Sequence, residues 1–265
     1  MELGLRDASV LITGGASNIG RGIVHAYAAE GSRIVICDID GDQAEQVRKE
    51  ALELGASNVE VAVEDLTDPD AATRATQLAI DTHGTVDVLV NNAGWSVPGF
   101  LSEDKDRSRW QRLVEVNFYG AIHATQAVIP AMKDAGKGSI VYVASEAAFG
   151  QIRQAVYGGT KAAVVALART TAREHGRHGI RANVVCPGLV IPESERAIGG
   201  KSLWSVGQDN VFDGKQIDFL LKDTPLRRLT TADDVANAVV WLSSDLAARQ
   251  VTGQLFTVSG GYTMP

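Results

Sequence analysis

Short apolar stretches rich in valine and isoleucine alternate with longer amphipathic stretches along the whole chain. In the first of the longer stretches, Ile19, Ile23, Val24 and Tyr27 fall on one stripe, which predicts a helix over residues 18–30. The short apolar stretches are residues 9–13, 33–38, 59–63, 86–90, 139–143, 182–186 and 255–258. Buried strands that alternate with helices predict an α/β fold, in which a doubly wound parallel sheet carries helices on both faces.

The longer stretches predict further helices and leave no obvious break between domains. One helix is expected over residues 42–54, and Asp68 is expected to cap another that Pro69 begins. A long pattern rich in alanine, valine and leucine predicts a helix over residues 157–178. Because no repeat or linker interrupts this order, residues 1–265 are expected to form one domain.

One irregular region, residues 189–223, is rich in glycine and charge and also contains Trp204, Val206, Val211 and Phe212. A connection of this length inside a compact domain usually has a function of its own. We favour a lid over a substrate pocket, and the alternative is a helical insertion that only packs.

Composition narrows the classes of function. Apolar residues make up 45% and charged residues 22%, which is ordinary for a globular protein. A net charge of −7 without a basic cluster argues against nucleic-acid binding. No apolar stretch is long enough to span a membrane, and the N-terminus lacks the pattern of a secretory signal, so a cytoplasmic location is expected. Cys37 and Cys186 lie in separate strand-like stretches and suggest no disulfide framework.

Tyr157 and Lys161 are a candidate pair for proton transfer. Their i,i+4 spacing on the expected helix places the side chains on one face, with Cβ atoms about 5–6 Å apart. A lysine ammonium favours the phenolate, by roughly 4 kcal/mol or about three pKa units at most for charges about 4 Å apart. The tyrosine could then exchange a proton near neutral pH. The alternative is a surface pair of the kind that this spacing often produces by chance.

A glycine-rich turn, residues 13–20, joins the first strand to the first helix. Glycines at such a turn let the backbone approach a pyrophosphate, and the helix N-terminus supplies amide groups and a positive dipole. The spacing is that of a TGxxxGxG turn, except that Asn18 stands where the middle glycine would be. Asparagine tolerates the left-handed conformation better than other non-glycine residues. The residues expected to bind the cofactor here are Gly14, Ser17, Asn18, Ile19 and Gly20.

Asp38 ends the second strand and favours NAD over NADP as the cofactor. A carboxylate at this position can accept hydrogen bonds from both hydroxyls of the adenosine ribose and would repel a 2′-phosphate. Neither Ser17 nor Ile39 supplies a cation for that phosphate. The alternative is that Asp38 is simply a turn residue at the end of a strand.

Several motifs in order resemble those of the short-chain dehydrogenase/reductase family over essentially the whole chain. The motifs are the turn at residues 13–20, Asn91-Asn92-Ala93-Gly94, Asn117, Ser145, Tyr157-x-x-x-Lys161 and Pro187-Gly188. The resemblance implies a seven-stranded Rossmann-type sheet, an oxidoreductase that interconverts a secondary alcohol and a ketone, and usually a homotetramer.

The resemblance also implies a role for each matching residue. Tyr157 would be the general acid/base, Lys161 would lower its pKa and bind the nicotinamide ribose, and Ser145 would hydrogen-bond the substrate oxygen. Asn117 would hold a water that links Lys161 to a proton relay. Further cofactor contacts are implied for Asp65, Leu66, Asn91, Ala93, Gly94, Pro187, Gly188 and Val190.

Two departures from the family pattern lead to expectations of their own. The interval from Ser145 to Tyr157 is one residue shorter than the commonest one, which predicts a tighter loop or a displaced Ser145. Pro192 stands where the family often has a threonine that bonds the carboxamide. Backbone groups around Val190 are therefore expected to take over that bond.

The substrate is expected to be a ring-bearing secondary alcohol or its ketone, free or linked to CoA. Several segments of the chain are similar to alicyclic hydroxyacyl-CoA dehydrogenases. The pocket is expected to involve Trp95, Glu146, Phe149, Arg153 and Trp204. Arg153, Arg196 and Lys201 could meet an anionic group of the substrate, or could simply be solvated.

Two other functions remain open. The chain could be a non-catalytic NAD(H)-binding sensor or scaffold, or an enzyme that retains NAD through an internal epimerisation. His175 and His178 have no evident third ligand, so we expect no metal site and interpret the pair as a helix end that favours the C-terminal dipole.

Overall fold

The computed structural model describes residues 2–202 and 214–265, and within these ranges it contains one parallel sheet of seven strands in the order β3-β2-β1-β4-β5-β6-β7. The strands are β1 (Ser9–Thr13), β2 (Arg33–Asp38), β3 (Asn58–Val63), β4 (Val88–Asn91), β5 (Gly138–Val143), β6 (Ile180–Pro187) and β7 (Leu255–Val258). Each lies at one of the predicted apolar stretches, so the predicted fold is confirmed. β1, β4, β5 and β6 are buried along their whole length, which is why they appear in the sequence as continuous rather than alternating apolar runs.

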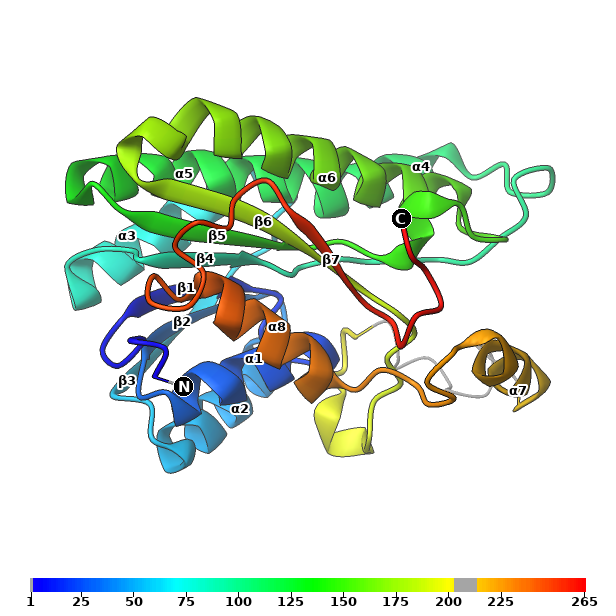
Figure 1. Cartoon of the computed structure of the whole chain (residues 1–265), viewed down its shortest axis with the longest axis horizontal. Helices are drawn as coiled ribbons and strands as arrows, with labels where there is room; N and C mark the ends of the chain where they lie inside the picture. Colours follow the sequence, from blue (N-terminus) through cyan, green and yellow to red (C-terminus); the bar gives the residue numbers. More distant parts are fainter. Residues whose placement is uncertain (1, 203–213) are drawn as a thin grey trace.

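Helices cover both faces of the sheet (Figure 1). One layer holds α1 (Asn18–Ala29), α2 (Gly41–Leu54) and α8 (Ala232–Ser243). The other holds α3 (Ala71–His83), α4 (Arg107–Val114), α5 (Gly120–Ala135) and α6 (Ala155–His175). A further helix, α7 (Gly214–Asp223), projects beside the sheet within the predicted lid region. An apolar core therefore lies on each side of the strands.

Two predicted helix ends are wrong. α3 begins at Ala71 rather than Pro69, because the amide of Asp68 donates to the carbonyl of Asp65 at 2.9 Å and the chain makes a turn first. The Asp68 carboxylate accepts from the amide of Asp70 at 3.1 Å and so serves that turn instead of capping the helix. The long helix begins at Ala155, and its end at His175 is followed by one 3₁₀ turn.

The chain order reverses between β1 and β4, and this reversal positions a binding crevice. From β1 the sheet extends to β2 and β3 on one side, and to β4 and the later strands on the other. In such a sheet, ligands bind outside the carboxyl ends of the strands at the reversal. There the Thr13 hydroxyl accepts from the amides of Asn92 and Ala93, each at 3.1 Å, and joins the loops that follow the two strands.

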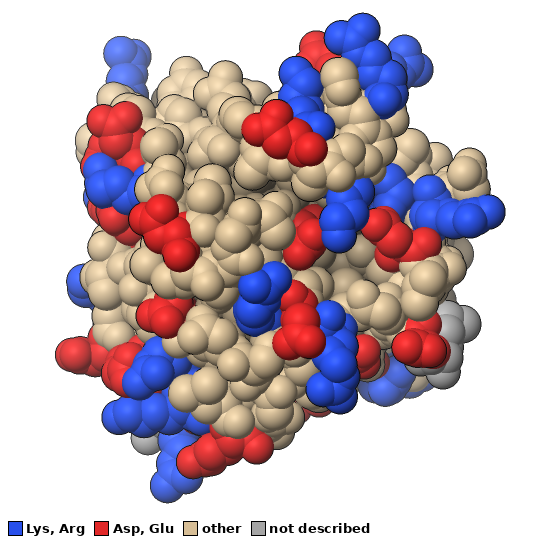
Figure 2. Space-filling view, turned by 90° about the vertical axis from the view of Figure 1, so that its left-hand side faces the viewer, with Lys and Arg blue, Asp and Glu red and all other residues tan. Residues whose placement is uncertain are grey.

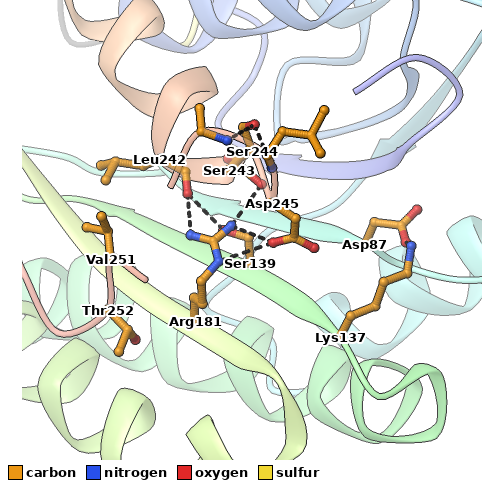
Figure 3. A network of polar contacts seen from close by, with 12 residues as sticks. Asp87, Lys137, Ser139, Arg181, Leu242, Ser243, Ser244, Asp245, Val251 and Thr252 are labelled. Atoms are coloured by element: carbon orange, nitrogen blue, oxygen red, sulfur yellow. Dashed lines mark hydrogen bonds and ion pairs between the residues drawn. The ribbon is translucent and has the colours of Figure 1, made fainter. Parts of the chain in front are cut away.

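Arg181 lies at the amino ends of the strands, opposite the crevice (Figure 3). It lies buried at the start of β6 and donates from Nη1 to the carbonyl of Leu242 at 2.6 Å and from Nη2 to that of Ser243 at 3.0 Å. Its Nη2 also pairs with Asp245 at 2.9 Å. The guanidinium thereby satisfies the carbonyl groups at the end of α8 and fastens that helix to the sheet.

Replacing Arg181 by lysine is expected to lower the free energy of unfolding by about 1–2 kcal/mol. A single ammonium cannot reproduce the planar fork, so one carbonyl at the end of α8 is left buried without a donor. Urea unfolding of both proteins measures the difference. Arg169→Lys, at an exposed position on α6, is the matched control, and equal midpoints for the two variants would contradict the assignment.

Figure 2 shows the side of the molecule that lies on the left of Figure 1, where α6 ends and β6 begins. On this face, Lys and Arg lie interspersed with Asp and Glu rather than gathered in one patch. It therefore presents no basic stripe of the kind that follows a phosphate backbone.

Within the described part of the chain, no helix has the length and apolar character needed to cross a membrane.

Candidate active site

A cavity of about 470 Å³ opens at the carboxyl ends of the strands. Of the predicted site residues, its lining includes Gly14, Ser17, Asn18, Ile19, Gly20, Asp38, Asp65, Leu66, Ala93, Gly94, Trp95, Tyr157 and Lys161. The residues come from loops that are far apart in the sequence, and the reversal of the strand order brings them together. The volume lies within the range of ordinary ligand pockets, which is about 300–1,000 Å³.

The glycine-rich turn folds as a close approach between β1 and α1. A Cβ at Gly20 would overlap the carbonyl oxygen of Gly14, so no larger residue fits there. Asn18 adopts a left-handed conformation with φ of 45°, as its place in the motif predicts. Its side-chain amide also donates to the carbonyl of Val190 at 3.2 Å, a contact that fastens this turn to the loop after β6.

The N-terminus of α1 faces the cavity without a side-chain cap. Ser17 occupies the cap position in an extended conformation, and its hydroxyl makes no capping hydrogen bond. Amide groups at the first turn of the helix are therefore available to an anionic ligand.

Asp38 is held by two backbone amides at the rim of the cavity. One carboxylate oxygen accepts from Ala16 at 2.9 Å and the other from Asp40 at 3.0 Å. Burial raises the pKa of Asp38, and these hydrogen bonds oppose the shift. Each oxygen keeps further acceptor capacity, which suits two neighbouring hydroxyls.

The predicted lid reaches the same end of the cavity. Gly199, Lys201 and Ser202 belong to the lining, and Lys201 donates from Nζ to the carbonyl of Ile39 at 2.9 Å. Its backbone amide donates to Asp40 at 3.1 Å. The sequence left open whether Lys201 meets the substrate or is solvated, and the structure places it near Asp38, where the sequence indicated no cation. Trp204 lies outside the described residues.

Ser145 and Tyr157 lie side by side; Tyr157 lines the cavity, whereas Ser145 lies just outside its lining. Ser145 ends the loop after β5, and its hydroxyl accepts from the amide of Ala147 at 3.2 Å. Burial raises the pKa of the half-buried Tyr157, and a hydrogen bond with Ser145 opposes that shift. The shortened interval between the two residues therefore does not separate them.

Lys161 lies beside Tyr157 but does not lower its pKa in this structure. The ammonium is buried, donates to the carbonyl of Val143 at 2.9 Å and lies 5.8 Å from the centre of the Tyr157 ring. Burial lowers the pKa of Lys161 to about 8. The expected fall in the pKa of Tyr157 is wrong for this structure, because desolvation of the phenol dominates.

Asn117 lies in a π-helical segment, Glu115–Tyr119, between α4 and α5. Such segments are rare and often occur at functional sites. The side chain of Asn117 accepts from the amide of Trp95 at 2.7 Å and donates to its carbonyl at 2.8 Å, which fixes the loop after β4. Asn91, Asn117 and Lys161 line a small cavity of about 10 Å³, which is room for one water molecule. An oxygen of Asn91 that has no partner among the described residues is available to such a water.

The remaining predicted residues lie outside the lining of the large cavity. Pro187 ends β6, and the amide of Gly188 donates to Val258 at 2.9 Å. Phe149 and Arg153 are exposed, and the guanidinium of Arg153 lies 5.7 Å from the ring centre of Phe100. Glu146 is buried, and its Oε1 lies near Gly188.

Sequence reasoning missed several residues of the lining, among them Arg112 and Val116. The Arg112 guanidinium lies 6.0 Å from the ring centre of Trp95, at the wall of the cavity. Nothing in the sequence distinguishes it from the other arginines of α4. At the end of α6, the rings of His175 and His178 lie 6.3 Å apart, and the described residues hold no cluster of three or more metal-ligating side chains.

The chain is similar to known proteins over nearly its whole length. A family model described as enoyl-(acyl carrier protein) reductase matches residues 14–263. The chain is 35% identical to (+)-borneol dehydrogenase 2 of Salvia officinalis, over 99% of this chain and 92% of that protein. It is 35% identical to the (2S)-[(R)-hydroxy(phenyl)methyl]succinyl-CoA dehydrogenase subunit BbsD of Thauera aromatica, over 99% of both. A structure of 7α-hydroxysteroid dehydrogenase with NADH and 7-oxo glycochenodeoxycholic acid superposes with a TM-score of 0.88 at 33% identity, over 98% of this chain and 96% of that one.

Proposed function

Since the chain belongs to the short-chain dehydrogenase/reductase family, and so is an oxidoreductase that acts on CH–OH groups, we propose that it interconverts a secondary alcohol and a ketone with NAD as the hydride carrier. The observation that carries the proposal is that Tyr157 lies beside both Ser145 and the buried Lys161, in the wall of a cavity that Asp38 also lines.

The residues that line the cavity fit NAD. The close turn at Gly14 and Gly20 admits a pyrophosphate beside the uncapped N-terminus of α1. Asp38, held by two amides, would accept the hydroxyls of the adenosine ribose. Leu66 and Asp65 would flank the adenine, and the loop after β4 would support the rest of the cofactor.

Tyr157 is the general acid/base in this proposal. In alcohol oxidation its phenolate takes the hydroxyl proton, and in ketone reduction its phenol returns that proton to the oxygen. The Ser145 hydroxyl donates a hydrogen bond to the same oxygen and stabilises the charge that develops there. Bound NAD would supply the hydride acceptor. The Lys161 ammonium would bond the nicotinamide ribose and, through a water held by Asn117 and Asn91, connect to solvent.

For the substrate we propose a ring-bearing secondary alcohol, free or linked to CoA. Trp95 and Val116 offer apolar surface in the cavity, and Arg112 offers a cation beside them. The names of the relatives specify borneol, a phenyl-bearing succinyl-CoA and a hydroxysteroid, which supports this class. We further propose that the enzyme is a cytoplasmic homotetramer and that residues 189–223 form its lid.

The test is the formation of NADH from NAD and a panel of cyclic alcohols, sugars, steroids and hydroxyacyl-CoA esters. Turnover of one class by the wild type, absent with Tyr157→Phe, is the expected result. Tight NADH binding without turnover across the panel would contradict the proposal and favour the alternative of a non-catalytic sensor. Cofactor that stays bound while the substrate changes configuration would favour internal epimerisation.

Replacing Asp38 by serine is expected to shift the preference from NAD toward NADP by about 10–100-fold in the ratio of kcat/KM values. The change removes both the acceptor for the ribose hydroxyls and the charge that repels a 2′-phosphate. Lys201 then lies within reach as a cation, so the gain with NADP should fall in Asp38→Ser/Lys201→Ala.

Asp42→Asn is the matched control for Asp38→Ser. Asp42 is exposed in the first turn of α2, close to the same strand end but outside the cavity lining. An unchanged preference in Asp38→Ser, or an equal shift in the control, would argue against the assigned role.

A further inference from the structure

Glu146 is a buried carboxyl group that the proposed mechanism does not use. It directly follows Ser145 and begins a 3₁₀ turn, Glu146–Phe149, whose cap is Ser145 itself. Its side chain is only 4% exposed, and it does not line the cavity that would hold cofactor and substrate. A carboxyl group buried next to the residue that binds the substrate oxygen needs a physical reason to be there.

The carboxyl group lies where three segments converge. A Cβ built on Gly188, at the end of β6, would lie 3.4 Å from its Oε1 and 3.2 Å from the Cα of Ser259. Gln151 donates to Oε2 at 3.3 Å. The hydroxyls of Ser259 and Thr263, in the C-terminal segment (residues 259–263), lie close enough to influence its pKa. Glu146 therefore connects the Ser145 turn to β6 and to the C-terminal segment.

The C-terminal segment in turn contacts the chain that follows α7. The Ser259 hydroxyl accepts from the amide of Thr263 at 3.3 Å, which closes the segment into a turn. The carbonyl of Gly260 accepts from the amide of Leu226 at 3.0 Å. A change in the position of the Glu146 side chain would thus alter the contacts of both Ser145 and the chain that follows α7.

No cation compensates the carboxyl group. Oε1 has no hydrogen-bond partner among the described residues. Burial raises the pKa of Glu146 to about 7, and the nearby hydroxyls of Ser259 and Thr263 and the hydrogen bond from Gln151 oppose this shift only in part. The titratable groups that face it are the thiol of Cys186 on β6 and the phenol of Tyr262 on the C-terminal segment.

These neighbours remain neutral near pH 7. Burial raises the pKa of Cys186 to about 11, and burial together with the charge of Glu146 raises that of Tyr262. On α6, which packs against the same turn, Tyr157 and Lys161 respond to Cys186 and not to Glu146. The neutral acid is then the form that fits the site, since it can donate a hydrogen bond from an oxygen that otherwise has no partner.

We propose that Glu146 is a positioning residue whose carboxyl group donates a hydrogen bond to the C-terminal segment and thereby holds the Ser145 turn against Tyr157. Ionisation removes this donor and leaves an uncompensated charge behind Ser145. The Ser145 hydroxyl then loses its alignment with the substrate oxygen. The consequence for turnover rests on the proposed function, whereas the consequence for stability does not.

Two variants test the proposal. Glu146→Gln keeps a donor and cannot ionise, and Glu146→Ala keeps neither property. As the pH rises from about 6 to about 8, wild-type kcat should fall relative to that of Glu146→Gln by up to about tenfold, because about a tenth of the acid form remains one unit above its pKa. Glu146→Ala should have a low kcat at both pH values with an unchanged KM for NAD. Glu53→Gln, exposed on α2, is the matched control for loss of a carboxylate.

Thermal unfolding without cofactor separates this proposal from the proposed function. The folded-state pKa lies above the ordinary value of 4.5, so the folded protein retains the proton to higher pH than the unfolded chain. The melting temperature of Glu146→Gln should therefore rise relative to wild type between about pH 4.5 and about pH 7 and stay level above that. If no substrate is turned over, this measurement still decides the protonation of Glu146. Parallel unfolding curves for wild type and Glu146→Gln, or parallel pH profiles of kcat, would overturn the proposal.

Discussion

Tyr157→Phe is expected to lower kcat by about 10²–10⁴-fold, because a proton can then leave or reach the substrate oxygen only through water. The loss should be in kcat rather than in cofactor binding. The phenol hydroxyl bonds Ser145, while the ring itself forms the cavity wall and is kept in the variant. Steady-state kinetics with the identified substrate measure the first quantity, and titration with NADH measures the second.

Tyr119→Phe is the matched control for this variant. Tyr119 is 49% exposed, so its hydroxyl is solvated and its loss should leave kcat unchanged. A Tyr157→Phe enzyme that retains more than about a tenth of wild-type kcat would assign the proton transfer to another group. Equal losses in both variants would point to a general disturbance of the fold.

Local patterns explain why the sheet could be predicted from the sequence. Each buried strand is a continuous apolar run, and each intervening helix carries a stripe of apolar residues. Both kinds of element can therefore be predicted without knowledge of the rest of the chain. The wrong start of α3 has the opposite cause. The residues around Pro69 could form either the first turn of the helix or a separate turn before it. The hydrogen bond from the amide of Asp68 to the carbonyl of Asp65 favours the separate turn, and residue spacing alone does not predict that bond.

In the candidate site, too, features set by local sequence patterns could be predicted, and those set by distant contacts could not. The glycine-rich turn, Asp38 and the pair Tyr157–Lys161 are contiguous or regularly spaced, and their position in the sheet follows from the strand order. The position of Lys201 could not be predicted, because it depends on the path of a long irregular segment. The bond from Asn18 to Val190 joins residues 172 positions apart, and no local pattern indicates it.

Burial accounts for the one electrostatic expectation that failed. The i,i+4 spacing of Tyr157 and Lys161 predicted a lowered pKa for the phenol, from the attraction between charges about 4 Å apart at an effective dielectric constant of about 20. In the structure both groups are desolvated, which raises the pKa of the tyrosine and lowers that of the lysine. Each group is thus shifted toward its neutral form. In the structure without ligand, the buried ammonium of Lys161 is therefore kept charged at a cost to the stability of the fold.

Lys161→Met is expected to abolish efficient turnover and, at the same time, to stabilise the protein by up to about 3 kcal/mol at neutral pH. The pKa of Lys161 falls from 10.5 to about 8, and about 1.36 kcal/mol per unit is the free-energy cost of keeping the buried ammonium charged. Methionine fills a similar volume without that charge. A catalytic group that lowers stability is an expected trade-off at an active site.

The pH dependence of the gain in stability shows whether removal of the buried ammonium charge is its cause. Because the folded-state pKa is the lower one, folded and unfolded chains are both protonated below about pH 8, and the full cost applies there. Between about pH 8 and about pH 10.5 the folded protein releases the proton first, so wild type should regain stability and the advantage of Lys161→Met should shrink. Urea unfolding across this range, with Lys49→Met as the control at an exposed position of α2, measures the difference. A variant that is less stable than wild type at pH 7 would mean that the bond from Lys161 to Val143 outweighs desolvation, and that Lys161 supports the fold as well as the reaction.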